Sequence, residues 1–421
     1  MNLLEVLGVG AAAFAVASCG AAPGETEATD TAAQALFGET QVKLVASNGA
    51  AEDWFGLSVD VSGSTAVVGA PLDDELGNAA GAAYVFDRAG GAWPERSKLV
   101  ASGGIAIERF GVRVAISGNT LVAGAPDDDG SVGAAYVFER AGEGWVQQAK
   151  LTPTQGHLGD RFGLAVAIAG NTIVVGSVLA DNDNGVDAGA AYVFRREGAS
   201  WSEEARLLAS DGAAFDTFGT GLAVQGNTVI VGAPQNDELG DDAGAVYVFT
   251  RAQGAWSEEA KLVATGGEAG DRFGGTVDIE GSTMLVGAVL ADGGSGGTVP
   301  EAGAAFVFKR SSAGWLQEAR LGAGDGGTGD RFGAGLGILG NAVVVGSPNN
   351  DNDNGTDAGA VYVFRQVGTA WALESKILAF DGAGGDQLGE SAAASGGIAV
   401  VGARFNDNAN GTDAGAAYVL Q

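Results

Sequence analysis

The sequence predicts an all-β chain that folds as a seven-bladed β-propeller, with four antiparallel strands in each blade. Glycine accounts for 73 of the 421 residues, and 46% of the residues are hydrophobic. A chain this hydrophobic can form a packed core, so we expect its glycines in many turns between short strands. The third observation is a repeat that recurs seven times at intervals of 52 to 59 residues, which is typical of propellers and other repeat architectures.

The repeat begins at a Phe-Gly dipeptide. Its copies start at Phe55, Phe110, Phe162, Phe218, Phe273, Phe332 and, in degenerate form, Leu388. Four short segments rich in Val, Ile, Tyr and Phe follow, bounded by Gly, Asn and Asp, which is the pattern of strands and turns. In the second copy these segments are residues 110–116, 120–126, 134–138 and 145–151. The turn Gly118-Asn119 joins the first two, because glycine supplies the positive φ of a tight hairpin.

A tryptophan opens the fourth segment in six copies, always six residues before an aliphatic residue. These are Trp93, Trp145, Trp201, Trp256, Trp315 and Trp371. Six occurrences at one offset favour a shared role in packing between neighbouring blades. Stacking of a ligand on these rings is the alternative.

The two ends of the repeat region complement each other. The seventh copy ends after its third segment, residues 416–420, and lacks a fourth. An unpaired segment of the fourth type, residues 41–46, precedes the first copy. We therefore predict that residues 41–46 complete the last blade and close the ring, which leaves no free sheet edge at the seam.

The motif Phe-Gly followed by Gly-Ala-Pro at the end of the second segment resembles the FG-GAP repeat. It occurs as Gly69-Ala70-Pro71, Gly124-Ala125-Pro126 and Gly232-Ala233-Pro234, with weaker versions in the other copies. Residues 189–194, Gly-Ala-Ala-Tyr-Val-Phe after an Asp/Asn loop, are most similar to the bacterial form. The resemblance implies a propeller like that of integrin α subunits and a role in binding or adhesion.

The N-terminus is similar to a lipoprotein signal. An apolar run at residues 6–16 leads into Val16-Ala17-Ser18-Cys19-Gly20, and the run is too short to span a membrane, which takes about 20 residues. We predict a signal peptide at residues 1–18, lipidation at Cys19, a flexible linker at 19–40 and the propeller at 41–421. Residues 1–5 lack Lys and Arg, which departs from the pattern. The expected location is the bacterial cell envelope, lipid-anchored at the outer membrane or cell surface, or the secreted fraction.

The formal net charge of −30 restricts the partners. It excludes nucleic acid as a ligand, because phosphate binding needs clustered Lys and Arg. Membrane contact is expected only through the lipid anchor, since no basic patch can attract anionic lipid. An acidic surface favours a soluble monomer and leaves cation binding open.

Strand alternation predicts where the acidic residues gather. The loops between second and third strands and those between successive blades fall on one face, and the short hairpins fall on the other. We expect the acidic face to contact the ligand. Its candidate residues are Asp73, Asp74, Asp127, Asp128, Asp129, Asp237, Asp241 and Asp242.

Three loops carry a candidate calcium motif. Residues 181–187 recur closely at 351–357 and more loosely at 407–413, with oxygen side chains at alternate positions and a glycine turn, which suits Ca²⁺. The candidate ligands are Asp181, Asp183, Asp187, Asp351, Asp353, Asp357, Asp407 and Asp413. The alternative is that these residues form Asx-turns, because the glycine lies one place earlier than in an EF-hand loop and no Glu closes the site. The calcium positions of integrins cannot be transferred, since a tight turn occupies that interval here.

No catalytic constellation stands out. An acidic residue two places before each Phe-Gly, from Asp53 to Asp386, occurs in all seven copies, so we predict that it binds backbone amides rather than catalyses a reaction. The single histidine, His157, lacks a nucleophile motif beside it. Carboxylate pairs suited to glycoside cleavage are abundant, and nothing singles out one pair.

These observations leave three functional hypotheses. The first is a non-catalytic, surface-anchored binding or adhesion propeller that recognises a protein or glycan through the acidic face, with Ca²⁺ as the one cofactor that the loops suggest. The second is a carbohydrate-active propeller enzyme that uses loop carboxylates. The third is a structural envelope lipoprotein. An enzyme predicts one loop whose chemistry is absent from the equivalent loops.

Overall fold

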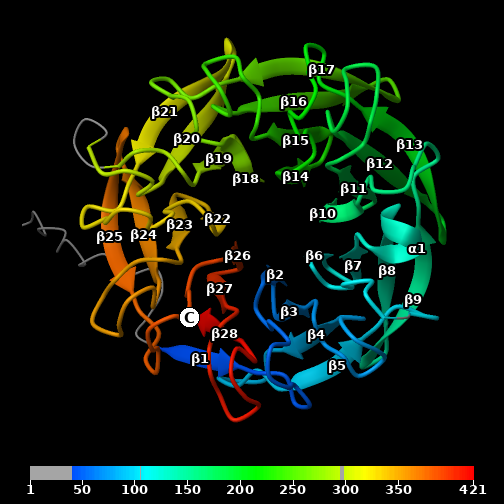
Figure 1. Cartoon of the computed structure of the whole chain (residues 1–421), viewed down its shortest axis with the longest axis vertical. Helices are drawn as coiled ribbons and strands as arrows, with labels where there is room; N and C mark the ends of the chain where they lie inside the picture. The colour runs from blue at the N-terminus through cyan, green and yellow to red at the C-terminus, as the bar shows by residue number, and fades with distance from the viewer. Residues whose placement is uncertain (1–39, 105, 294–297) are drawn as a thin grey trace, which may run out of the picture. The chain divides into compact units, whose positions relative to one another are not determined.

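The computed structural model describes residues 40–104, 106–293 and 298–421. These residues lie in one compact unit. Their strands form seven four-stranded antiparallel sheets, which stand as blades around a central channel (Figure 1). The predicted fold class is confirmed.

Each of the first three blades is a meander of consecutive strands. Blade 1 consists of β2 (Ser58–Ser62), β3 (Thr65–Ala70), β4 (Ala82–Asp87) and β5 (Glu95–Leu99). Blade 2 consists of β6 (Val114–Ser117), β7 (Thr120–Ala125), β8 (Ala134–Ala141) and β9 (Gly144–Leu151). Blade 3 consists of β10 (Phe162–Ala169), β11 (Thr172–Ser177), β12 (Ala190–Glu197) and β13 (Ser200–Leu207).

The next three blades repeat this order. Blade 4 consists of β14 (Leu222–Gln225), β15 (Thr228–Ala233), β16 (Ala245–Ala252) and β17 (Ala255–Leu262). Blade 5 consists of β18 (Phe273–Glu280), β19 (Thr283–Ala288), β20 (Ala304–Ser311) and β21 (Gly314–Leu321). Blade 6 consists of β22 (Leu336–Leu339), β23 (Ala342–Ser347), β24 (Ala360–Val367) and β25 (Ala370–Ile377).

Blade 7 combines the two ends of the described chain. It consists of β26 (Ala392–Ser395), β27 (Ile398–Ala403), β28 (Ala416–Leu420) and, as its outer strand, β1 (Gln41–Leu44). β1 runs antiparallel to β28, with Gln41 opposite Leu420 and Leu44 opposite Ala417. The backbone N–H of Gln421 also donates to the carbonyl oxygen of Thr40 at 3.2 Å. The last sheet therefore takes its fourth strand from the opposite end of the repeat region.

Sequence character follows the position of each strand within its blade. The second strands β3 and β7, for example, are buried at every residue, because they lie in the middle of a sheet that neighbouring blades cover on both faces. The fourth strands lie at the rim; β17, for example, alternates between exposed and partly buried residues. Continuous apolar runs in the sequence therefore correspond to strands inside the blades, and alternating runs correspond to strands at the outer rim.

The Phe-Gly motif performs two packing tasks. Phe55 is fully buried and packs edge-on against Tyr84 and Phe86 of the third strand, with ring centroids 5.5 and 6.0 Å apart. Gly56 has φ +99°, and a Cβ there would lie 2.2 Å from the carbonyl oxygen of Ala416 in the preceding blade. Glycine is required at this position because the backbones of neighbouring blades meet there.

The first strands differ from the predicted bounds. In the second copy the prediction begins at residue 110, whereas β6 begins at Val114. Gly111, with φ +86°, interrupts the ladder after the Phe-Gly anchor. In blade 3 the same interruption appears as a register shift between Phe162 and Ala165.

One short helical turn departs from the all-β pattern. α1 (Asp128–Ser131) lies in the loop between β7 and β8 and includes Asp129 and Gly130 at positive φ. No helix among the described residues is long and apolar enough to cross a membrane. The predicted signal peptide at 1–18, the lipidation site Cys19 and the linker up to residue 39 lie outside the described residues.

Candidate functional site

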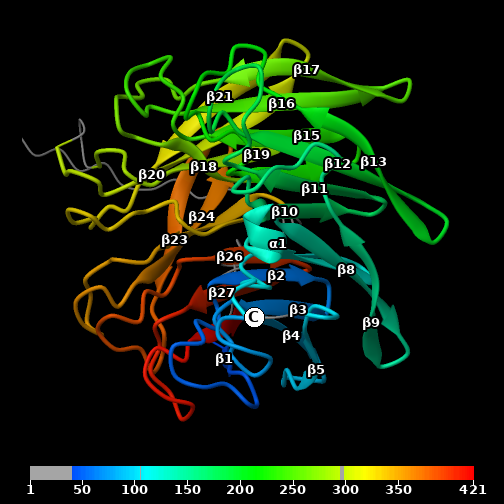
Figure 2. The ribbon, with the colours of Figure 1, turned by 45° about the vertical axis from the view of Figure 1, so that its right-hand side comes forward.

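The loops of the propeller separate onto two faces. The loop between second and third strands ends beside the Phe-Gly of the next blade, as shown by the bridges of Gly81 with Phe110 and of Gly133 with Phe162. We call the face formed by these loops and the loops between blades the loop face. The hairpins between third and fourth strands, such as β8–β9 and β12–β13, project on the other side (Figure 2), which we call the hairpin face.

The repeated acid before each Phe-Gly is a structural residue, as predicted. In six blades its carboxylate accepts the backbone N–H of the residue three places earlier, at 2.7 to 3.0 Å. These six residues are Asp53, Asp160, Asp216, Asp271, Asp330 and Asp386, and all are buried. Burial raises the pKa of Asp53 to about 6, although the hydrogen bond from Ala50 lowers it.

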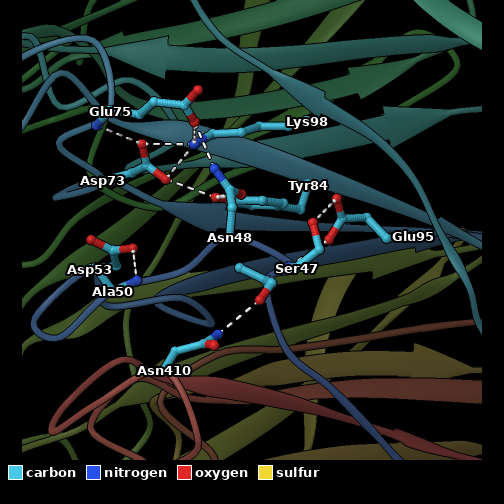
Figure 3. Close-up of polar contacts among 11 residues, drawn as sticks. Ser47, Asn48, Ala50, Asp53, Asp73, Glu75, Tyr84, Glu95, Lys98 and Asn410 are labelled. Atoms are coloured by element: carbon cyan, nitrogen blue, oxygen red, sulfur yellow. Dashed lines mark hydrogen bonds and ion pairs between the residues drawn. The ribbon is translucent and has the colours of Figure 1, made fainter.

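A second acidic residue is fixed inside blade 1. Asp73 accepts the hydroxyl of Tyr84 at 2.7 Å and the ammonium of Lys98 at 2.7 Å, and Lys98 also contacts Glu75 at 2.5 Å. Asn48, from the loop that enters the blade, donates to Glu75 at 2.6 Å. Figure 3 shows this network beside Asp53. Asp73 is only 3% exposed, so the network stabilises the blade and leaves Asp73 unavailable to a ligand.

The same Tyr–acid–Lys cluster recurs with the acid drawn from different loops. In blade 2, Asp128 accepts from Tyr136 at 2.5 Å and from Lys150 at 2.8 Å. In blades 4, 6 and 7 the acid comes from the loop that enters the blade. These acids are Asp211, Asp325 and Asp381. Because the arrangement recurs while its sequence position changes, it belongs to the framework.

The candidate ligand-face residues therefore divide into two groups. Asp73 and Asp128 are buried, and Asp127 is held by Arg109 at 2.9 Å with its side chain 8% exposed. These three carboxylates are shielded from solvent and paired with Lys98, Lys150 and Arg109, so they are poorly placed to contact a ligand. Asp74, Asp129, Asp237 and Asp241 are exposed, and Asp242 is partly exposed.

The candidate calcium loops form Asx-turns. Asp181 accepts the backbone N–H of Asp187 at 2.9 Å, and Asn182 accepts that of Asn184 at 2.8 Å. The loops at 351–357 and 407–413 repeat this pattern. Asn184 also donates to the carbonyl oxygen of Ala209 at 2.8 Å.

Within the described ranges no three Asp, Glu, His or Cys side chains are grouped so that they could hold a metal ion. Asp183, Asp353, Asp181, Asp351 and Asp407 are exposed, while Asp187, Asp357 and Asp413 are partly exposed. Calcium binding by these loops stays a prediction.

The tryptophans pack at the boundaries between neighbouring blades, as predicted. The buried indole nitrogens of Trp93, Trp145 and Trp315 have no hydrogen-bond partner among the described residues, whereas the other three tryptophans form a hydrogen bond across the boundary. The indole N–H of Trp201 donates to Gln148, that of Trp256 to Glu204 and that of Trp371 to Glu318, at 2.9 to 3.0 Å. In each pair the acceptor lies on the fourth strand of the preceding blade.

The central channel holds two carboxylates that sequence reasoning missed. The inner strands of all seven blades line a cavity of about 330 Å³. Asp60 accepts the N–H of Val61 and, from the next blade, that of Ile116, both at 2.7 Å; Asp278 binds Ile279 and Ile338 in the same way. Burial raises the pKa of Asp60 to about 7 and that of Asp278 to about 6. The signal was available, because the other five copies have Ala or Gly at this position.

His157 lies on the loop face. Its side chain is 73% exposed, and its Nδ1 lies 3.7 Å from Oδ2 of Asp160. Asp160 itself is engaged with the backbone N–H of His157 at 2.9 Å.

The fold and its loops define a closed, seven-bladed β-propeller whose repeated carboxylates serve the framework. The chain belongs to the FG-GAP repeat family. The family repeat matches residues 38–86, 93–138, 145–194, 201–249, 256–308, 315–364 and 371–420. Each match begins with a fourth strand and ends with the third strand of the next blade, so the family repeat is offset from the blade. No curated protein matches the sequence at a significant level.

Proposed function

We propose that this FG-GAP propeller is a non-catalytic, surface-anchored binding or adhesion module that recognises a protein or glycan through its loop face. One observation carries the proposal: exposed carboxylates and exposed large apolar side chains occur together on that face. Ile107, Leu158, Phe215 and Phe380, in loops between blades, are 58 to 78% exposed. A partner that covers this face would bury these apolar side chains together with the exposed carboxylates.

The acids on the loop face differ in what they can contribute. Asp74, Asp129, Asp237 and Asp241 point into solvent, whereas the carboxylates that recur in every blade are buried and hydrogen-bonded. The exposed acids can therefore pair with a basic partner surface, while the framework acids keep the loops in place. Electrostatic pairing of this kind speeds association and weakens with salt.

The envelope location enters the same proposal. Lipidation at Cys19 would hold the propeller at a membrane while residues 19–40 act as a tether. An anchored protein meets its ligand on the outer side of the envelope, where adhesion ligands are found. Calcium would act by fixing the three Asp/Asn loops.

A pair of charge variants tests the loop face. We would convert Asp74, Asp129, Asp237 and Asp241 to Asn in the full chain, and probe binding on a glycan array and on a panel of immobilised basic proteins. The control variant converts Glu143 and Glu197, exposed on the hairpin face, to Gln. The proposal expects binding that the first variant loses and the second keeps, with melting temperatures unchanged. Equal binding by all three proteins would reject the loop face as the recognition surface.

A further inference from the structure

Five residues near the mouth of the channel depart from the repeat. Arg404 stands where the other six copies have Pro or Val, and Glu390 where they have Leu, Val, Thr, Gly or Ala. Arg113 replaces Ser, Ala, Gly or Thr. Trp54 and Phe405 are the only aromatic residues at their repeat positions. We call these five residues the mouth cluster. The anchor positions of the repeat carry similar residues from blade to blade, whereas these five residues have no equivalent in the other blades.

The structure brings the five together from three adjacent blades. The guanidinium carbon of Arg404 lies 4.5 Å from the ring centroid of Phe405 and 5.3 Å from that of Trp54. The two rings meet edge-on at 5.7 Å. Nη1 of Arg404 lies 3.5 Å from Oε1 of Glu390. Two aromatic rings and one acid thus fix the position of this arginine.

Arg113 adds a second guanidinium at the same opening. Arg113 and Glu390 both line the central channel, and Nη1 of Arg113 donates to the carbonyl oxygen of Val112 at 3.0 Å. The walls of the channel lower the pKa of Arg113, Glu390 raises it and Arg404 lowers it. These mutual effects mean that the three charged groups lie within electrostatic reach of one another.

Both arginines retain unused donors. Nε of Arg404 is buried and has no hydrogen-bond partner in the structure. Its contact with Glu390 is longer than the roughly 2.8 Å of a charge-assisted hydrogen bond. Arg113 forms no ion pair with a carboxylate of the described residues. A chain with a net charge of −30 has ample acids to pair its arginines, so two under-used guanidinium groups at one opening mark a place for an anion.

The stability of the fold does not explain why an arginine stands at position 404. The other six blades close their second strand with Pro or Val and remain fully formed, so the fold does not need Arg404. A buried N–H left without an acceptor costs about 1 to 3 kcal/mol. An anion at the opening could accept from the exposed donors of the Arg404 guanidinium, which Glu390 engages only at 3.5 Å.

We propose that the mouth cluster binds an acidic sugar, with the carboxylate of a uronic acid on the guanidinium groups of Arg404 and Arg113. Arginine binds a planar carboxylate through paired N–H donors. The exposed parts of Trp54 and Phe405 offer flat apolar surface to the sugar ring, and Glu390 can accept a sugar hydroxyl. This site binds through positive charge, whereas the proposed function rests on exposed acidic residues of the loop face. Either proposal can therefore be rejected without the other.

Calorimetric titration of the full chain with trigalacturonate tests the proposal. We expect Kd below about 1 mM for the wild type. Arg404→Gln and Arg113→Gln should each weaken binding roughly tenfold or more, because each removes hydrogen bonds to a charged group. The matched control is Arg331→Gln, which removes one exposed positive charge of the same face outside the cluster and should leave Kd unchanged.

Two comparison ligands separate the contribution of the carboxylate from that of the sugar ring. The neutral galactose trisaccharide should bind at least tenfold more weakly than trigalacturonate, because it lacks the carboxylate. Triglutamate should also bind weakly, since it lacks the sugar ring. Melting temperatures check that the variants fold, and Arg113→Gln remains decisive if Arg404→Gln unfolds. The proposal is overturned if the wild type does not bind trigalacturonate, if either comparison ligand binds as tightly, or if Arg331→Gln weakens binding equally.

Discussion

Nζ of Lys43 lies 2.7 Å from Oδ2 of Asp381. The two residues belong to opposite ends of the repeat region; the side chain of Lys43 is 18% exposed and that of Asp381 is 36% exposed. Asp381 also accepts the hydroxyl of Tyr418 at 2.8 Å. The Tyr–acid–Lys cluster that other blades build within themselves is therefore assembled across the seam in blade 7.

The first prediction concerns that seam. Deletion of residues 41–46 removes β1 and leaves β28 as an open edge, so we expect a lower melting temperature and a less cooperative transition. The matched control deletes residues 25–30 of the predicted linker and should melt like the full chain. Circular dichroism during heating measures both. Identical melting of the two deletions would contradict a closed ring.

A second prediction separates backbone clash from backbone strain. Gly56→Ala places a Cβ 2.2 Å from Ala416, whereas Gly63 has φ +59° with open space around it. Gly63→Ala should cost about 1 kcal/mol from its positive φ alone. Gly56→Ala should destabilise the protein substantially more, as measured by denaturant unfolding. Similar losses for the two would mean that the blades do not approach as closely as described.

The third prediction follows from the channel carboxylates. The folded-state pKa of Asp60 is about 7, above its usual value near 3.8, so the folded protein binds an extra proton between these limits. Its contribution makes stability fall as pH rises through this window. Asp60→Asn should therefore raise the melting temperature by about 2 °C or more at pH 8 relative to pH 5. The exposed Asp129→Asn serves as the control, and an equal response from both would refute the assignment.

The fourth prediction compares the neighbouring residues Asp73 and Asp74, of which the first is buried and the second exposed. Asp73→Ala removes a buried acceptor from the hydroxyl of Tyr84 and from the ammonium of Lys98 and leaves them only their contacts with Asn48 and Glu75, so it should destabilise the protein by about 1 to 3 kcal/mol. Asp74→Ala changes an exposed carboxylate and should alter stability by less than about 0.5 kcal/mol. Urea unfolding of the two variants gives the comparison. The reverse order would show that Asp73 is not part of the framework.

The fifth prediction distinguishes calcium from Asx-turns in the three loops. Calcium binding predicts a melting temperature that rises with Ca²⁺, falls with chelator and loses this response in the double variant Asp181→Asn with Asp351→Asn. Asparagine keeps an oxygen that can accept the N–H of Asp187 or Asp357 but loses the charge. If the loops are Asx-turns alone, neither calcium nor the double substitution should shift the melting temperature.

The sequence predicted the framework well because the framework repeats. Seven Phe-Gly anchors, the glycine turns and the incomplete last copy specify the blades, and the acids before Phe-Gly were assigned a structural role that the hydrogen bonds confirm. The division between Asp73 and Asp74 was not predictable, because their burial depends on Lys98 and Tyr84, which approach only in the folded blade. The mouth cluster was also missed. Its signal is the departure of Arg404 and Trp54 from the repeat, whereas the predicted sites rest on residues that several copies share.

The hydrogen bond between Thr40 and Gln421 places the two ends of the described repeat region side by side. A short linker could join these two positions, and new termini could be opened in another surface hairpin, such as the turn between β8 and β9. Such circular permutants would keep every blade and would move the entry point of any tether around the ring. The direction in which the propeller presents its faces to its surroundings could then be set by the choice of break, independently of the residues that recognise the ligand.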